Sequence, residues 1–385
     1  MSTKVLTLSS VLLVCGSVIA CTAPRTKVHE VQITDPVAPQ VRPQVHKVTQ
    51  YCNEQGHPVS YSLAFETPVC IDGVCRPVRA SMFWDALGNF EKLQVPTDWP
   101  LTKKEHKPFS EADYLKLQHV LKMKQSILGK YTPDALAKQD PNTAWMWRTE
   151  KETTPLSNVD GVTAATPLTI QKSVVEDAAY TTWTLWWWAN GDIVPILRRL
   201  TLRHMDEGYL KFLLISGKQV YVSFALKYLK ENCVENEAFV DAVLNLMRNT
   251  VRENFTLALA YLTEAVEDHS QLHQRLIKAS VQMRVSHSPL ILDYLDNQEK
   301  LSADTLEMLA GALDRFGYYQ VHLILRLLEK HQWFTKKTES HIAGLLSSED
   351  FFIARRAYTY LQQHDISART RAELDAFEKQ HGERL

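Results

Sequence analysis

The chain has 385 residues, 45% of them hydrophobic, so it can bury a sizeable core, and its length favours two domains. The formal net charge is -1 and there is no cluster of basic residues, which argues against a nucleic-acid-binding protein. Neither a Gly-x-Ser-x-Gly element nor a glycine-rich phosphate-binding lysine loop occurs, so the sequence gives no reason to propose hydrolytic chemistry.

The first residues predict export. Lys4 precedes an apolar run over residues 5–20, too short to span a bilayer, which ends in Val18-Ile19-Ala20-Cys21. This tetrapeptide resembles the lipobox of bacterial lipoproteins, which implies a signal peptide over residues 1–20 and lipidation of Cys21. A signal anchor is the alternative, but the polar residues after Cys21 interrupt the apolar run. Thr22, rather than Asp, beside the lipidated cysteine resembles outer-membrane sorting in Gram-negative bacteria, so we expect an anchor there, facing the periplasm.

The next segment, residues 21–50, is polar and shows no sustained apolar periodicity. It contains four prolines: Pro24, Pro36, Pro39 and Pro43. This composition predicts a semi-extended tether of ~90 Å at most, at about 3.1 Å per residue.

Cysteines Cys70 and Cys75 flank Asp72-Gly73, a dipeptide favoured in two-residue hairpin turns. Ile71 and Val74 would close the turn, which places the two cysteines opposite each other, about 4.5 Å apart at Cα and within disulfide range. An exported protein would keep this disulfide, although a strained, reducible redox pair is the alternative. The sequence does not determine whether Cys52 and Cys233 are paired.

Two short strands are predicted at residues 78–83 and 90–95, joined by the turn-rich link 84–89. A polar loop with Lys103, Lys104, His106 and Lys107 follows, either as a solvated loop or as a site that attracts an anion. Ser110 then caps a helix whose apolar face carries Tyr114, Leu117, Val120 and Leu121.

The segment Asp160-Gly161-Val162-Thr163-Ala164-Ala165-Thr166 is followed by an amphipathic run that predicts a helix from Pro167 to Ala189. Thr166 would then stand at a helix N-terminus, where unpaired backbone N–H groups and the helix dipole favour a phosphate.

This segment resembles the flavinylation motif of extracytoplasmic FMN-binding domains, Asp-x-x-Ser/Thr-Gly-Ala-Thr, with Ala164 where the family usually has glycine. The resemblance implies FMN covalently attached through Thr166, with Asp160, Thr163, Ala164 and Ala165 forming the site that a flavin transferase reads. The strand, turn and strand at residues 78–95 resemble the start of that domain, in which a bent sheet lies against the helix that carries the flavin.

The second half of this helix is unusually aromatic. Trp183, Trp186 and Trp187 share one face, which suits either stacking on an isoalloxazine ring or packing. Trp183 would lie about 25 Å beyond Thr166 on a continuous helix, so we expect these tryptophans to pack against the next domain.

Beyond residue 191 the sequence repeats every 33 residues. The last leucine of an apolar hexapeptide recurs at this spacing, at Leu229, Leu262, Leu295, Leu328 and Leu361. A second column of aliphatic residues consists of Val243, Leu276, Leu309 and Ile342. A third consists of Leu244, Ile277, Ala310, Ala343 and Ala376. Two helices per unit predict an α-solenoid. Because the repeats lack the signatures of ankyrin and tetratricopeptide repeats, we describe them as HEAT-like. His269 and His273 have the i, i+4 spacing of metal ligands, but without a His-Glu-x-x-His motif we expect surface histidines and no metal site.

The expected fold class is therefore an α+β flavin-type domain of short antiparallel strands and helices over residues 51–191, followed by an all-α solenoid of helical hairpins over residues 192–385. One hypothesis is a membrane-anchored FMN-binding lipoprotein that transfers electrons outside the cytoplasm, with the repeats docking a protein partner, for example a redox protein. The alternative is a cell-envelope adaptor without flavin.

Overall fold

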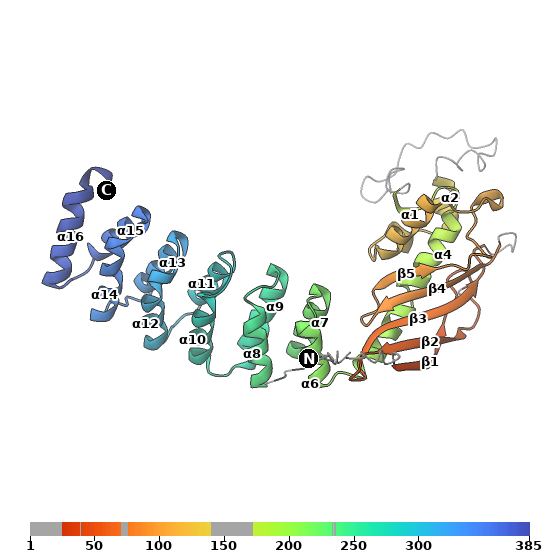
Figure 1. Ribbon diagram of the computed structural model, residues 1–385, viewed down its shortest axis with the longest axis horizontal. Coiled ribbons are helices and arrows are strands. Elements are labelled where there is room, and N and C mark those ends of the chain that lie inside the picture. The colour runs from red at the N-terminus through yellow and green to blue at the C-terminus, as the bar shows by residue number, and fades with distance from the viewer. Residues whose placement is uncertain (1–24, 39, 71–75, 140–171, 233, 235) are drawn as a thin grey trace, which may run out of the picture. The chain divides into compact units, whose positions relative to one another are not determined.

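The computed structural model describes residues 25–38, 40–70, 76–139, 172–232, 234 and 236–385 (Figure 1). The chain divides into two compact units, Met1–Met205 and Asp206–Leu385. The first contains a five-stranded antiparallel sheet with a few helices, and the second consists of packed helices. This is the expected fold class, an α+β domain followed by an all-α array of helical hairpins.

The sheet of the first unit is a simple meander, in which each strand pairs with the next along the chain (Figure 1). Its strands are β1 Arg25–Ile33, β2 Gln44–Cys52, β3 Pro58–Thr67, β4 Val78–Asp85 and β5 Phe90–Gln94. The last two are the strands that the sequence predicts.

The predicted tether is wrong from Arg25 onward. Nine residues of β1 pair with nine of β2, from Arg25 opposite Cys52 to Ile33 opposite Gln44. Most of the β1 side chains are exposed, so the strand has no continuous apolar face that would reveal it in the sequence. Backbone hydrogen bonds to β2 hold it instead. Pro36 and Pro43 lie in the connection between these strands, where their missing N–H groups leave the ladder intact.

One face of the sheet is apolar because its inward residues alternate along β3 and β4. The fully buried ones are Tyr61, Leu63, Met82 and Trp84. The β4–β5 turn is held by Asp85, whose carboxylate accepts hydrogen bonds from the backbone N–H groups of Leu87 and Asn89, each 2.9 Å long. Gly88 in that turn has a φ of +72°, which glycine adopts without steric cost.

Helices pack on this apolar face. The helices of the unit are η1 Lys104–His106, α1 Glu111–Lys122, η2 Ile127–Gly129, α2 Pro133–Gln139, α4 Ala179–Asn190 and α5 Ile193–Leu202. Ser110 caps α1 as predicted, in a reciprocal capping box with Asp113. The Trp84 indole N–H donates to the Ala189 carbonyl at 2.8 Å, which fixes α4 against β4.

The domain boundary expected at residue 191 lies too early. Ile193, Leu197 and Leu200 of α5 are buried in the same core as the sheet. The Tyr61 hydroxyl of β3 and the Thr201 hydroxyl of α5 are 2.8 Å apart, so α5 is part of the first unit.

The second unit is a stack of helical hairpins that appear as successive pairs in Figure 1. Odd-numbered helices form one row and even-numbered helices the other: α6 Glu207–Ile215, α7 Gln219–Glu231, α8 Glu237–Leu246, α9 Arg252–Ala265, α10 His269–Ser280, α11 Ser288–Asp296, α12 Ala303–Gly311, α13 Tyr318–Lys330, α14 Lys336–Gly344, α15 Phe351–Leu361 and α16 Ala368–His381. Short turns η4 Leu313–Arg315, η5 Leu345–Ser347 and η6 Gly382–Arg384 accompany them.

The 33-residue register predicts the core of this unit. All five column leucines, from Leu229 to Leu361, are 0% exposed, and so is the column from Val243 to Ile342. The third column is buried from Leu244 to Ala343, but its last member, Ala376, is exposed. In α16 the buried apolar positions are Leu374 and Phe377, so the pattern shifts in this helix.

Candidate functional site

The predicted flavin site, from Asp160 through Thr163, Ala164 and Ala165 to Thr166, lies outside the described residues, and so does the lipidation site Cys21. On the C-terminal side of the motif, the described residues begin again at Lys172. This segment belongs to the first unit, since Val174 and Val175 are buried in its core.

The helix predicted from Pro167 to Ala189 is not continuous over its described part. A helical turn ends at Ser173, and α4 begins only at Ala179. Between them Asp177 has a φ of 58°, and its carbonyl accepts a hydrogen bond from the backbone N–H of Lys104 at 2.9 Å. The chain therefore turns before α4, so the assumption of one straight helix, from which the rise of about 25 Å between Thr166 and Trp183 was calculated, does not hold.

The tryptophans of α4 pack on other segments of the first unit, where we expected them to pack against the next domain. The indole N–H groups of Trp183, Trp186 and Trp187 donate to the carbonyls of Tyr131, Met123 and Leu128 over 2.9, 2.8 and 3.1 Å. Trp188 donates to the Thr67 hydroxyl of β3 at 3.2 Å. An indole has one donor, and each of these finds a partner on a neighbouring segment of the same unit.

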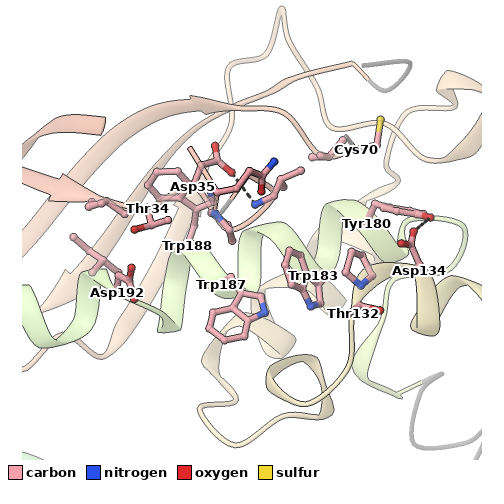
Figure 2. A pocket seen from close by; sticks show the side chains of 17 residues that line it. Thr34, Asp35, Cys70, Thr132, Asp134, Tyr180, Trp183, Trp187, Trp188 and Asp192 are labelled. Carbon is pink, nitrogen blue, oxygen red and sulfur yellow. Dashed lines mark hydrogen bonds between the residues drawn. The ribbon is translucent and has the colours of Figure 1, made fainter. Parts of the chain in front are cut away.

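The same helix forms one wall of a cavity of about 820 Å³ (Figure 2). The cavity has the size of a small-molecule site. Its walls come from the turn after β1, the end of β3, the start of α2, and α4 with the start of α5: Ile33, Thr34, Asp35, Pro36, Val37, Gln40, Val69, Cys70, Thr132, Pro133, Asp134, Tyr180, Trp183, Trp187, Trp188, Asp192 and Ile193.

The aromatic wall consists of Tyr180, Trp183, Trp187 and Trp188, which are presented along α4 in Figure 2. Trp188 stacks on Phe65 of β3 with ring centroids 4.4 Å apart, which fixes its plane. Trp183 and Trp187 are only partly buried and lie 5.9 Å apart in a tilted arrangement. The wall therefore offers large, oriented ring surfaces to a ligand.

The polar groups of the cavity are carboxylates and neutral groups. Asp35 accepts hydrogen bonds from the Val37 backbone N–H and the Thr67 hydroxyl, both at 2.9 Å. The Tyr180 hydroxyl donates to Asp134 at 2.6 Å (Figure 2). Among the described lining residues there is no lysine, arginine or histidine. The cavity therefore favours an uncharged planar group over an anion.

Beside the cavity, the His46 ring meets the edge of Trp188 with centroids 5.2 Å apart. Burial lowers the pKa of His46 below its ordinary value, and the charge of Asp35 only partly opposes this shift. The imidazole is therefore held preferentially in its neutral form.

Cys70 is disulfide-bonded and Cys52 is a free, buried thiol, so these two are not partners. The predicted partner Cys75 lies outside the described residues. The described β3–β4 register ends with Thr67 opposite Val78. Cys233, like Cys75, is not described.

The basic loop before α1 is partly neutralised. The ammonium group of Lys103 lies 2.8 Å from the Asp113 carboxylate, and that of Lys107 lies 3.2 Å from Glu105. At least two of its four predicted cationic side chains thus have acidic partners, which weakens the attraction of this loop for an anion.

The two histidines of α10 differ in burial: His269 is exposed, whereas His273 is not. His273 is buried, contrary to the expected surface position, and its Nε2 lies 3.5 Å from the Tyr294 hydroxyl. Across the described part of the chain, no group of three or more His, Cys, Asp or Glu side chains is placed to hold a metal ion.

Comparisons with protein-family models, curated proteins and solved structures found no match. Within the described ranges, no helix combines the length and apolar character needed to cross a membrane.

Proposed function

We propose that the protein is a membrane-anchored FMN-binding lipoprotein, lipidated at Cys21 and carrying flavin on Thr166, that transfers electrons outside the cytoplasm at the outer membrane. The observation that carries this proposal is the aromatic cavity of about 820 Å³ in the unit that also contains the flavinylation-like motif. Motif and cavity are independent features, and a flavin would use both.

The described residues suit the ring system of FMN. Trp183 and Trp187 offer partly buried indole faces for stacking on the isoalloxazine ring, while Tyr180 and Asp134 supply polar groups at the edge. They do not suit the phosphate, because the lining carries Asp35, Asp134 and Asp192 without a cationic partner among the described lining residues. This difference would be explained if the phosphate were esterified at Thr166, outside the cavity, and only the isoalloxazine ring entered the cavity.

A bound flavin supplies one- and two-electron chemistry, and the protein would position it and tune its potential. The indoles would hold the ring and exclude water from its faces. The neighbouring carboxylates would disfavour additional negative charge on the ring and so lower its reduction potential. The stacked helices of the second unit would dock a protein partner, such as a redox protein, because such arrays present extended surfaces.

The second candidate is a cell-envelope adaptor without flavin. The lack of cationic side chains in the described lining of the cavity favours it, since noncovalent FMN would then find no partner for its phosphate.

Intact mass and absorbance after co-expression with a flavin transferase test the proposal. The wild-type chain should gain the mass of one FMN less water, and Thr166→Ala should remove this gain because the acceptor oxygen is lost. Asp160→Asn should reduce loading if the transferase reads this acid, whereas Thr163→Ala should only weaken it. Absence of the mass gain and of flavin absorbance with Thr166 intact would favour the adaptor.

A second variant tests whether the isoalloxazine ring lies in the cavity. Trp187→Leu should leave the covalent mass gain unchanged but alter the flavin absorbance spectrum and raise fluorescence, because the stacked indole quenches and shields the ring. The control is Trp186→Phe, which changes a buried tryptophan that does not line the cavity. An unchanged spectrum in Trp187→Leu would place the ring elsewhere.

A further inference from the structure

The exposed apolar side chains of the second unit are confined to one edge. The unit has seven large exposed apolar residues among those described, and every one lies where an even-numbered helix leads into the next odd-numbered helix: Ile215, Val220, Val251, Val285, Tyr318, Tyr319 and Phe352. We call these five connections, with the first turn of each odd-numbered helix, the loop edge. Val285 is 78% exposed and Phe352 is 61% exposed, so these side chains project into solvent. The opposite edge, between odd- and even-numbered helices, has no such residue among those described.

The loop edge is continuous, because contacts join each connection to the next. The Asn254 side chain donates to the Gln219 carbonyl at 3.0 Å, which links the starts of α9 and α7. Phe255 and His287 lie 5.1 Å apart at their ring centroids and link α9 to α11.

The C-terminal half of the edge is joined in the same way. The Gln320 amide donates to the Val285 carbonyl at 3.3 Å, and Tyr318 meets Phe352 edge to face at 5.9 Å. The apolar residues thus form one line across the unit and not five unrelated positions.

The charge along this line is predominantly positive over the first four connections. Over these four connections five exposed basic residues, Lys218, Arg248, Arg252, Arg284 and Arg315, stand against two exposed acids, Glu253 and Asp314. The fifth connection, which leads to Phe352, is acidic and carries the exposed Glu349 and Asp350, so the positive charge belongs to the part of the edge from α7 to α13. On the opposite edge, around α8 and α10, Glu237, Glu264, Glu267 and Asp268 are acidic, and two of them have basic partners: Glu237 lies 2.5 Å from Arg275 and Glu264 lies 3.0 Å from Lys230. An anionic surface would therefore attract the unit by its loop edge.

We propose that the loop edge lies on an anionic membrane surface, with its apolar side chains inserted between lipid headgroups. Its apolar residues project singly from successive loops, a spacing that suits insertion between lipid headgroups better than the continuous groove that a bound peptide needs. Tyrosine, aliphatic tips and interleaved arginine suit the membrane interface, where apolar parts enter the acyl boundary and cations meet anionic headgroups.

Vesicle sedimentation tests this proposal independently of flavin loading and lipidation. We would use a chain that begins at Thr22, which lacks the signal sequence and the acylated cysteine but keeps every residue of both cores. It should bind vesicles of phosphatidylglycerol and phosphatidylethanolamine, bind phosphatidylcholine vesicles far more weakly, and dissociate as salt is raised.

Substitutions on the edge should weaken this binding without unfolding the chain. The triple variant Val285→Ser/Tyr319→Ser/Phe352→Ser should reduce partitioning at least tenfold, and Arg252→Gln and Arg284→Gln by up to about fivefold each. Matched controls are Leu115→Ser, a 67% exposed leucine on α1, and Lys300→Gln on the opposite edge, which should change little.

Three outcomes would overturn the proposal: no vesicle binding by the unsubstituted chain, equal losses in the edge variants and the controls, or edge variants that keep vesicle binding while losing self-association or a protein complex. The last would identify the edge as a protein interface.

Discussion

At the scale of single residues, several polar side chains inside both units are held by specific hydrogen-bond partners. The indole N–H groups on α4 each reach a carbonyl or hydroxyl, and the Tyr261 hydroxyl donates to the Val234 carbonyl at 2.8 Å. A buried donor left without an acceptor costs about 1–3 kcal/mol, so these contacts select one arrangement of the core.

His273 makes the second unit sensitive to acid. Burial, reinforced by nearby His269, lowers the pKa of His273, with Asp268 opposing the shift. In the unfolded chain its pKa would be the ordinary 6.5, so the unfolded state takes up a proton first as the pH falls. The stability that neutral His273 provides is therefore complete above about pH 6.5 and is lost as the pH falls below that value toward the lower, folded-state pKa.

Thermal melting between pH 7.5 and pH 5 measures this effect. The wild-type chain should lose stability as the pH falls, and His273→Leu should lose less over the same interval because its side chain does not titrate. The same pH slope in both proteins would show that His273 does not contribute.

At the scale of elements, repeated apolar columns hold the second unit together. Leu295 on α11 is 0% exposed and occupies the final leucine column, whereas Lys227 of α7 lies at an exposed position of the equivalent hexapeptide. In α16 Ala376 is exposed while Leu374 and Phe377 are buried, so the columns describe the packing of the earlier hairpins.

We expect Leu295→Ala to reduce the free energy of unfolding by ~2–5 kcal/mol, because it opens a cavity between packed helices. Lys227→Ala should cost less than ~0.5 kcal/mol. Denaturant melts of the two variants compare them directly, and equal losses would contradict the assigned register.

At the scale of the whole molecule, the proposed anchor and the proposed membrane-facing edge would act together. A lipidated Cys21 would keep the chain near a bilayer, where even weak contacts from the loop edge are effective because the second contact becomes intramolecular. The five-stranded sheet starts at Arg25, so the tether between Cys21 and the fold is far shorter than the composition suggests.

Replacing the anchor tests this arrangement. Cys21→Ser should give an unlipidated protein with an uncleaved N-terminus, because lipidation and cleavage both require the cysteine. Mass spectrometry of the N-terminal peptide and membrane fractionation provide the readout. If the wild-type protein is recovered from the periplasm in soluble form and begins at another residue, the lipoprotein assignment is wrong.

The sequence by itself determined the features whose signals are local. The column from Leu229 to Leu361 predicts the helical hairpins because each unit packs mainly on the next, so one period describes every interface. The cap at Ser110 and strands β4 and β5 are likewise encoded in short stretches. The motif that ends at Thr166 remains a prediction from sequence alone.

Only the tertiary structure decided features that depend on distant partners. β1 is a polar strand stabilised by backbone pairing with β2, and hydrogen bonds of this kind carry no apolar pattern that would distinguish the strand from a tether. The helix interruption at Asp177 and the tryptophan partners just after α1, in η2 and in β3 likewise arise from non-local contacts. For the same reason the sequence showed aromatic residues on α4 but not the cavity they line, since its other wall comes from the turn after β1.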